Sequence, residues 1–145
     1  MNITPYNIGL QRVDRATGDV YTGSAVSIYT ITGGRVLVAN LFGKVTTVLG
    51  AASTGKFSMD PTTGTTIDLC AAGSSATDEA GTLYSLTGTP ADAMLKGSSG
   101  GTRALSNPLV IDIGAITFTG ANTTGSANFQ CWWMPLDDGA TLVAA

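Results

Sequence analysis

Histidine is missing from all 145 residues of the chain. It is the commonest general base, the usual partner of a nucleophilic serine and a frequent zinc ligand, so its absence removes several kinds of active site together. Adjacent acids occur only as Asp78-Glu79 and Asp137-Asp138, and neighbouring side chains on a strand point to opposite faces. We therefore predict a protein that is not an enzyme and that holds neither a cofactor nor a metal.

Cysteine is nearly absent as well. Cys70 and Cys131 are the only two, and they form no CxxC pair of the kind that binds metals or exchanges disulfides. We expect both to be reduced core residues. A disulfide between them is the alternative, because two strands of a sandwich can bring two cysteines together.

Charge is scarce, at 12% of residues against about 25% in an ordinary soluble domain. The net charge is −3, and the seven Lys and Arg residues are scattered singly from Arg12 to Arg103. Binding to a phosphate backbone needs clustered cations, so we predict no nucleic-acid partner. So few charges also give a free monomer little electrostatic protection, which favours a chain that covers much of its surface with partners.

Long apolar runs are missing too. No run approaches the roughly 18 residues of a membrane span, and the start MNITPYNIGL has no basic or apolar region of a signal peptide. We expect neither membrane insertion nor Sec-type secretion.

One glycine-rich segment imitates a nucleotide-binding loop. Residues 50–56 match the glycine and lysine positions of a P-loop and follow a predicted strand. Phe57, however, stands where the magnesium-binding hydroxyl belongs, and the residues after it cannot form the long helix that holds the phosphates. We interpret the segment as a hairpin loop.

What the sequence has is a regular series of turn signals, about every 8 to 12 residues, separated by runs rich in Val, Ile, Thr, Tyr and Phe. This spacing predicts an all-β, single-domain, jelly-roll-like β-sandwich with at most one or two short helices. We assign residues 21–145 to the sandwich. Residues 1–20 form an N-terminal segment whose first residues are either an extended arm or a frayed terminus.

Strands are expected at 8–14, 25–32, 35–42, 45–49, 56–59, 65–70, 82–86, 109–113, 115–119 and 126–134. Gly33 and Gly34 suggest a two-residue hairpin turn between the second and third of these. In the third, alternation places Val36, Val38 and Phe42 on one face. A short helix is expected from Thr89 to about Lys96, and a flexible loop over 97–102.

The strand at 126–134 has the most informative pattern. Its alternation puts Phe129, Cys131 and Trp133 into the core, and the opposite face mixes polar residues with a tryptophan and a methionine. Such a face is typical of a surface covered by a partner, or of one buried under a loop of the same chain. The candidate interface residues are Gln130, Trp132 and Met134, together with Tyr6 of the N-terminal segment.

Five blocks of the sequence form a further pattern, at residues 31–38, 43–49, 78–84, 86–88 and 135–140. Together these blocks resemble small virion proteins of tailed bacteriophages. The family is that of the capsid decoration or cement proteins, and Trp132 departs from it because a small polar residue is expected there.

The resemblance implies a structural virion protein on the outer surface of the capsid, assembled in the host cytoplasm, that stabilises the shell by bridging subunits of the major capsid protein. The threefold sites of such a shell favour a homotrimer, with a homodimer as the alternative. A tail, fibre or baseplate component and a glycan-binding β-sandwich are the alternative functions.

Overall fold

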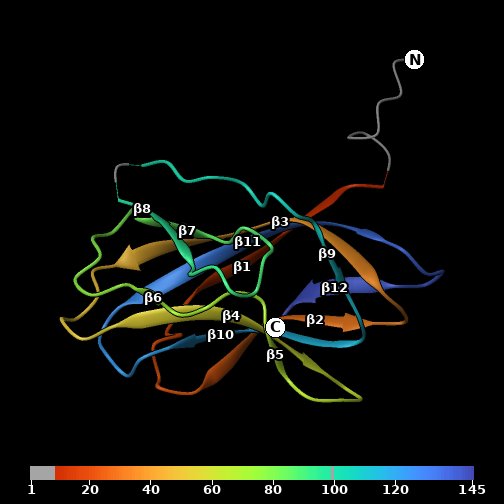
Figure 1. Cartoon of the computed structure of the whole chain (residues 1–145), viewed down its shortest axis with the longest axis horizontal. Coiled ribbons are helices and arrows are strands. Elements are labelled where there is room, and N and C mark those ends of the chain that lie inside the picture. Colours follow the sequence, from red (N-terminus) through yellow and green to blue (C-terminus); the bar gives the residue numbers. More distant parts are fainter. Residues whose placement is uncertain (1–8, 99) are drawn as a thin grey trace.

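The computed structural model describes residues 9–98 and 100–145, which fold into two antiparallel sheets packed face to face (Figure 1). The all-β sandwich predicted from the sequence is confirmed, and none of the described residues forms a helix. No segment of them is therefore a helix long and apolar enough to cross a membrane.

Sheet A has six strands, in the order β1-β11-β3-β7-β8, with β9 also paired to β3. Their bounds are Gln11–Gly18 (β1), Val36–Thr47 (β3), Leu83–Ser85 (β7), Leu95–Gly97 (β8), Leu109–Ile111 (β9) and Ser126–Pro135 (β11). Because β1 pairs with β11, the sandwich already includes residues 11–18, which we had assigned to the N-terminal segment.

Sheet B also has six strands, in the order β12-β2-β10-β4-β5, with β6 paired to β4. Their bounds are Ala25–Thr32 (β2), Thr54–Pro61 (β4), Ile67–Asp68 (β5), Gly73–Ser74 (β6), Gly114–Gly120 (β10) and Thr141–Ala144 (β12). The apolar residues 141–144 thus supply an edge strand.

An aromatic cluster fills the space between the sheets. Phe118 of β10 packs edge-on against Phe57 of β4 and Tyr21, with ring centroids 5.3 and 5.6 Å apart. Phe129 of sheet A completes the cluster at 5.3 Å from Phe118. These contacts bury the largest side chains where the sheets face each other, which gives the face of β11 that carries Phe129 a fixed position.

The glycine pair after β2 is not a hairpin turn, and this prediction is wrong. β2 belongs to sheet B and β3 to sheet A, so Gly33 and Gly34 carry the chain from one sheet to the other. Gly33 has φ = +79°, and a Cβ there would lie only 2.1 Å from the carbonyl oxygen of Gly139. The glycines are required because the β2–β3 connection passes tightly under the β11–β12 turn.

A β-bulge in β3 overturns the predicted side-chain pattern of that strand. Trp133 of β11 pairs with Val38 and Trp132 pairs with Asn40, so Ala39 is an extra residue without a partner. A bulge changes the phase of the alternation. Val36 and Val38 point into the core. After the bulge the next core residue is Leu41, so Phe42, which we had predicted on the face of Val36 and Val38, points outward.

The helix expected from Thr89 to Lys96 is also wrong. The start signal yields a single turn, in which the Asp92 amide donates to the Thr89 carbonyl over 3.0 Å. Leu95–Gly97 then forms β8 against β7. One turn gains too few hydrogen bonds to offset the cost of starting a helix, whereas pairing with β7 satisfies the same backbone groups.

Candidate interaction face

The outer face of sheet A carries the candidate residues that the structure describes. In β11 the residues alternate strictly, with Phe129, Cys131 and Trp133 at most 3% exposed and the residues between them partly buried. The predicted alternation of this strand is therefore confirmed. Gln130, Trp132 and Met134 lie together on the outer face, whereas Tyr6 lies outside the described residues.

The strands on either side of β11 extend this face. On β3, Phe42 is opposite Gln130, Asn40 is opposite Trp132, and Leu37 is opposite Met134. We call the group Leu37, Phe42, Gln130, Trp132 and Met134 the outer patch. Sequence reasoning missed Leu37 and Phe42, and no signal in the sequence marks the bulge that places Phe42 here.

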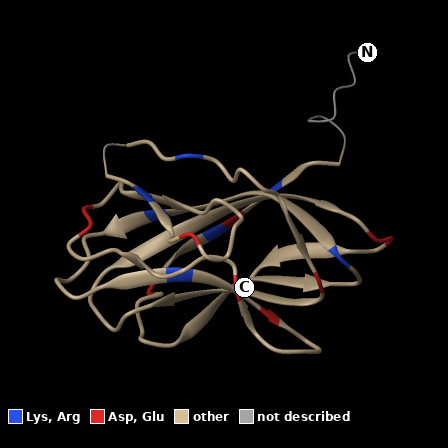
Figure 2. Cartoon of the chain, viewed as in Figure 1, with Lys and Arg blue, Asp and Glu red and all other residues tan. Residues whose placement is uncertain are grey.

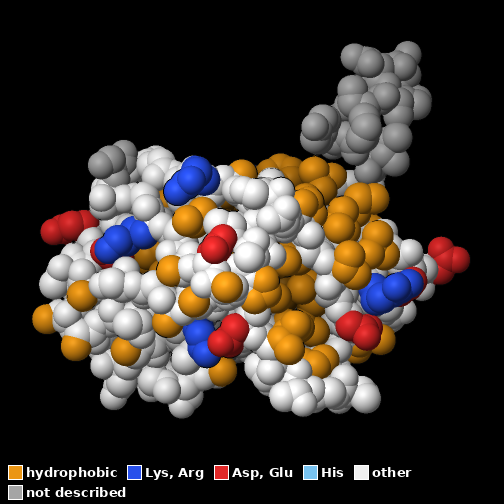
Figure 3. Space-filling model, viewed as in Figure 1, with side chains coloured by type: hydrophobic (Ala, Val, Ile, Leu, Met, Phe, Trp, Pro, Cys, Tyr) orange, Lys and Arg blue, Asp and Glu red, His pale blue; other side chains and the backbone are white. Residues whose placement is uncertain are grey.

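Apolar surface continues from the outer patch to the edge of sheet A. Leu37 pairs with Val110 of β9, whose side chain is 61% exposed. Figure 3 shows hydrophobic side chains gathered around β9. Below β9 they continue into a groove of about 280 Å³ that reaches Ile67 of β5, itself 57% exposed.

A loop of the same chain covers one part of the face. Residues 100–108, which we call the strap, run from β8 towards β9 along the outside of sheet A (Figure 1). The Leu105 amide donates to Asn40 Oδ1 over 3.2 Å, and the amides of Ser106 and Asn107 donate to the Thr87 carbonyl over 3.1 and 2.9 Å. The strap thus covers the face beside Asn40 and leaves Trp132 partly exposed. The alternative of burial under a loop therefore holds for the part beside Asn40, and coverage of the rest by a partner stays a prediction.

The polar groups on this face bind one another. Trp132 Nε1 donates to Gln130 Oε1 over 2.9 Å. Arg12 of β1 donates to both carboxylate oxygens of Asp14 over 2.9 and 2.7 Å, which lowers the pKa of Asp14 from its ordinary value. Groups that are already paired lose less when a partner displaces water. These two pairs therefore lower the cost of covering the part of the face around Trp132 and β1.

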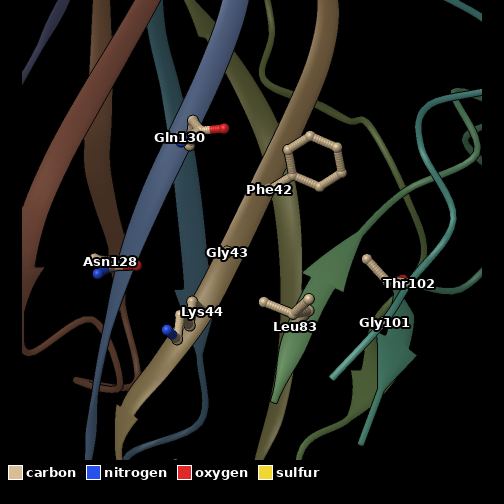
Figure 4. A pocket seen from close by; sticks show the side chains of 8 residues that line it. All are labelled: Phe42, Gly43, Lys44, Leu83, Gly101, Thr102, Asn128 and Gln130. Atoms are coloured by element: carbon tan, nitrogen blue, oxygen red, sulfur yellow. The ribbon is translucent and has the colours of Figure 1, made fainter. Parts of the chain in front are cut away.

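A groove of about 410 Å³ opens at one end of the outer patch, and Figure 4 shows its lining. Phe42 and Leu83 supply apolar surface, the amides of Asn128 and Gln130 stand on the β11 side, and Gly101 and Thr102 of the strap form the opposite wall. Lys44 lies between Leu83 and Asn128 in the register of three neighbouring strands. An adjoining hollow is lined by Lys96 and Arg103 and shares the strap wall.

The buried polar groups have structural roles. Tyr84 donates to Asp78 Oδ2 over 2.6 Å, and Lys96 Nζ donates to Asp78 Oδ1 over 2.8 Å, which joins β7, β8 and the loop before them. Both cysteines are free and buried, and desolvation raises the pKa of the Cys131 thiol to about 12. The prediction of reduced core cysteines is confirmed, and neither thiol is a ready nucleophile.

Residues 50–56 do not form a phosphate-binding loop. Thr54 begins β4, so Lys56 lies within a strand, where its Nζ is 2.9 Å from Asp68 Oδ1. A P-loop needs a helix after the glycines to direct backbone amides at the phosphates, and a strand provides none. Among residues 9–98 and 100–145, no group of three potential metal ligands occurs.

Comparison of the chain with protein-family models, with curated proteins and with solved structures gave no match. The function is therefore argued from the fold and from the outer patch.

Proposed function

We propose that the protein decorates the capsid of a tailed phage and stabilises the shell by bridging subunits of the major capsid protein through the outer patch. The observation that carries this proposal is the patch itself. The apolar residues Leu37, Phe42, Trp132 and Met134 lie on neighbouring positions of β3 and β11, partly buried, on the outer face of sheet A. Interfaces favour aromatic residues and methionine and exclude unpaired charge, and this patch has that composition.

The physical logic of the proposal is multivalency. Each copy contacts the shell through one modest face, and an oligomer that holds several faces converts weak contacts into tight attachment. A trimer at a threefold site of the shell matches the symmetry of the clamp to that of its target. The resemblance of residues 31–38, 78–84 and 135–140 to decoration proteins supports the capsid context, as does the small number of charges.

The test is the location of the chain and the role of Trp132 there. We expect the protein to co-purify with DNA-filled heads and not with isolated tails. Trp132→Ala should lower its occupancy on heads by thirtyfold or so, the effect of losing an interface anchor of about 2 kcal/mol. Val143→Ala, which truncates a 53% exposed side chain on sheet B, should leave occupancy unchanged. Recovery with tails, or equal effects of the two variants, would contradict the proposal.

A glycan-binding role is the second candidate, and the position of Phe42 favours it. The bulge at Ala39 places this ring outward and directly opposite Gln130 of β11, and Trp132 lies two residues further along the same face of β11. An aromatic ring beside an amide can stack on one face of a sugar and bind its hydroxyl groups. Saturable binding to a glycan array that is lost in Phe42→Ala, with no association with heads, would support this function over decoration.

A further inference from the structure

The groove beside Phe42 has a local charge that is opposite to that of the whole protein. Lys44 lines it, Lys96 and Arg103 line the adjoining hollow, and no acidic side chain lines either one. Lys96 is paired with Asp78, but Lys44 and Arg103 form no ion pair with the described residues. A chain of net charge −3 therefore presents a groove with an apolar floor and the unpaired Lys44, next to a hollow with the unpaired Arg103.

The opposite end of the molecule carries a turn with the complementary chemistry. The β11–β12 turn, residues 136–140, forms the tip of the long axis (Figure 1), where Figure 2 colours the ribbon for acidic residues. Leu136 is 44% exposed, and Asp138 is exposed and has no ion pair among the described residues. The turn thus presents an apolar side chain and a free carboxylate two residues apart.

Hydrogen bonds fix the conformation of this turn in the free protein. Asp137 accepts hydrogen bonds from the backbone amide, Nε and Nη2 of Arg35 over 2.8, 2.9 and 2.8 Å. The Leu136 amide donates to the Arg35 carbonyl over 2.9 Å, and the Ala140 amide to the Asp137 carbonyl over 3.1 Å. A preformed turn loses little conformational entropy on docking, which favours binding.

The groove and the turn of one molecule cannot meet. Asn128 lies near the beginning of β11 and Leu136 directly after its end, so about eight extended residues, roughly 26 Å, separate them. Any contact between the two must join different copies. A contact between unlike surfaces is heterologous, and it produces a closed ring when the rotation between copies closes.

We propose that the protein assembles head to tail, with Leu136 of one copy in the groove beside Phe42 of the next copy. Asp138 of the first copy then lies beside Lys44 of the second. The occupant of the groove is a second copy of this chain. The contact deepens the proposed function. That the ring closes at three copies rests on that function, because it follows from the threefold sites of the shell. It leaves the centre of the outer patch, with Trp132 and Met134, available to the shell.

A charge exchange tests the contact with the full chain. The self-association constant, measured by analytical ultracentrifugation, should fall on the order of tenfold in Lys44→Glu and in Asp138→Lys, because each places like charges together. The double variant restores opposite charges and should recover the association of the native chain. Lys56→Glu in sheet B is the matched control and should associate normally. Leu136→Ala should weaken the contact without changing charge. Lys44, Leu136 and Asp138 are exposed and Lys56 is partly exposed, so circular dichroism should be unchanged.

Three results would overturn the inference: a chain that stays monomeric, single variants that associate as the native chain does, or a double variant that does not recover. Lower occupancy on heads in Lys44→Glu with unchanged self-association would also overturn it, because the occupant would then be a segment of the shell. Head binding remains a separate measurement. Recovery of self-association by the double variant in a protein that never binds heads would uphold the contact and reject the decoration function.

Discussion

Two neighbouring tryptophans on β11 provide an internal comparison. Trp133 is 3% exposed and points into the core, whereas Trp132 is partly buried on the outer patch. The two residues share a strand and a chemical type, so truncating each to alanine compares the two faces directly. The difference between the variants measures how far the fold depends on each face.

The expected losses follow from what each truncation leaves behind. Trp133→Ala opens a cavity between the sheets, which typically costs about 3–5 kcal/mol of unfolding free energy. Trp132→Ala removes apolar contacts and the hydrogen bond to Gln130, but water fills the open site and no cavity forms. We expect a loss of about 1–2 kcal/mol for this variant.

Thermal unfolding followed by circular dichroism measures both losses. For a domain of this size, about 3 °C per kcal/mol gives a decrease in Tm of about 10–15 °C for Trp133→Ala and a few degrees for Trp132→Ala. Urea unfolding provides the free energies independently. Equal losses would show that the strap buries Trp132 as part of the fold. The assignment of Trp132 to a partner surface would then be wrong.

Three further predictions concern other parts of the molecule. The Arg35 guanidinium and amide lower the pKa of Asp137 to about 2 from an ordinary value near 4. The stability that this pair contributes is therefore present above about pH 4 and lost as the pH falls through about 2. Asp137→Asn should flatten the acid side of a curve of Tm against pH, and Asp138→Asn should not. Gly33→Ala should destabilise the protein more than Gly139→Ala does. Both glycines have positive φ, but only a Cβ at Gly33 would clash with the Gly139 carbonyl. Chemical denaturation of the two variants measures the difference in unfolding free energy. Cys70 and Cys131 should react with a thiol reagent only on the unfolding timescale, since desolvation raises the pKa of both thiols; rapid labelling of the folded protein would contradict their placement in the core.

The sequence predicts the class of fold well because the evidence for it is local. β-branched runs and turn residues repeat along the whole chain, and the alternation in 126–134 places Trp133 and Cys131 in the core as found. Such signals depend on neighbouring residues alone, so the expected strands agree closely with β2, β10 and β11.

The predictions that fail are those that depend on partners distant in the sequence. Gly33 and Gly34 have the composition of a hairpin turn. Whether β2 pairs with β3 or the chain crosses to the other sheet depends, however, on the other strands with which β2 and β3 pair. Phe42 was placed on the face of Val36 and Val38 because the unpaired residue Ala39, which reverses the alternation, is defined only by the register with β11. The helix after Thr89 gives way to β8 for the same reason, because β7 offers a partner that the local sequence does not reveal.

The order of the strands has a consequence for how the protein is made. β11 lies between β1 and β3 in sheet A, and β10 lies between β2 and β4 in sheet B. The central strand of each sheet is thus synthesised after both of its neighbours, and until then the apolar β2 and β3 have unpaired edges. Contacts so distant in sequence also make folding slow. The nascent chain is therefore most exposed to aggregation and to chaperones just before residues 114–135 emerge, and the sandwich closes only after these residues have been translated.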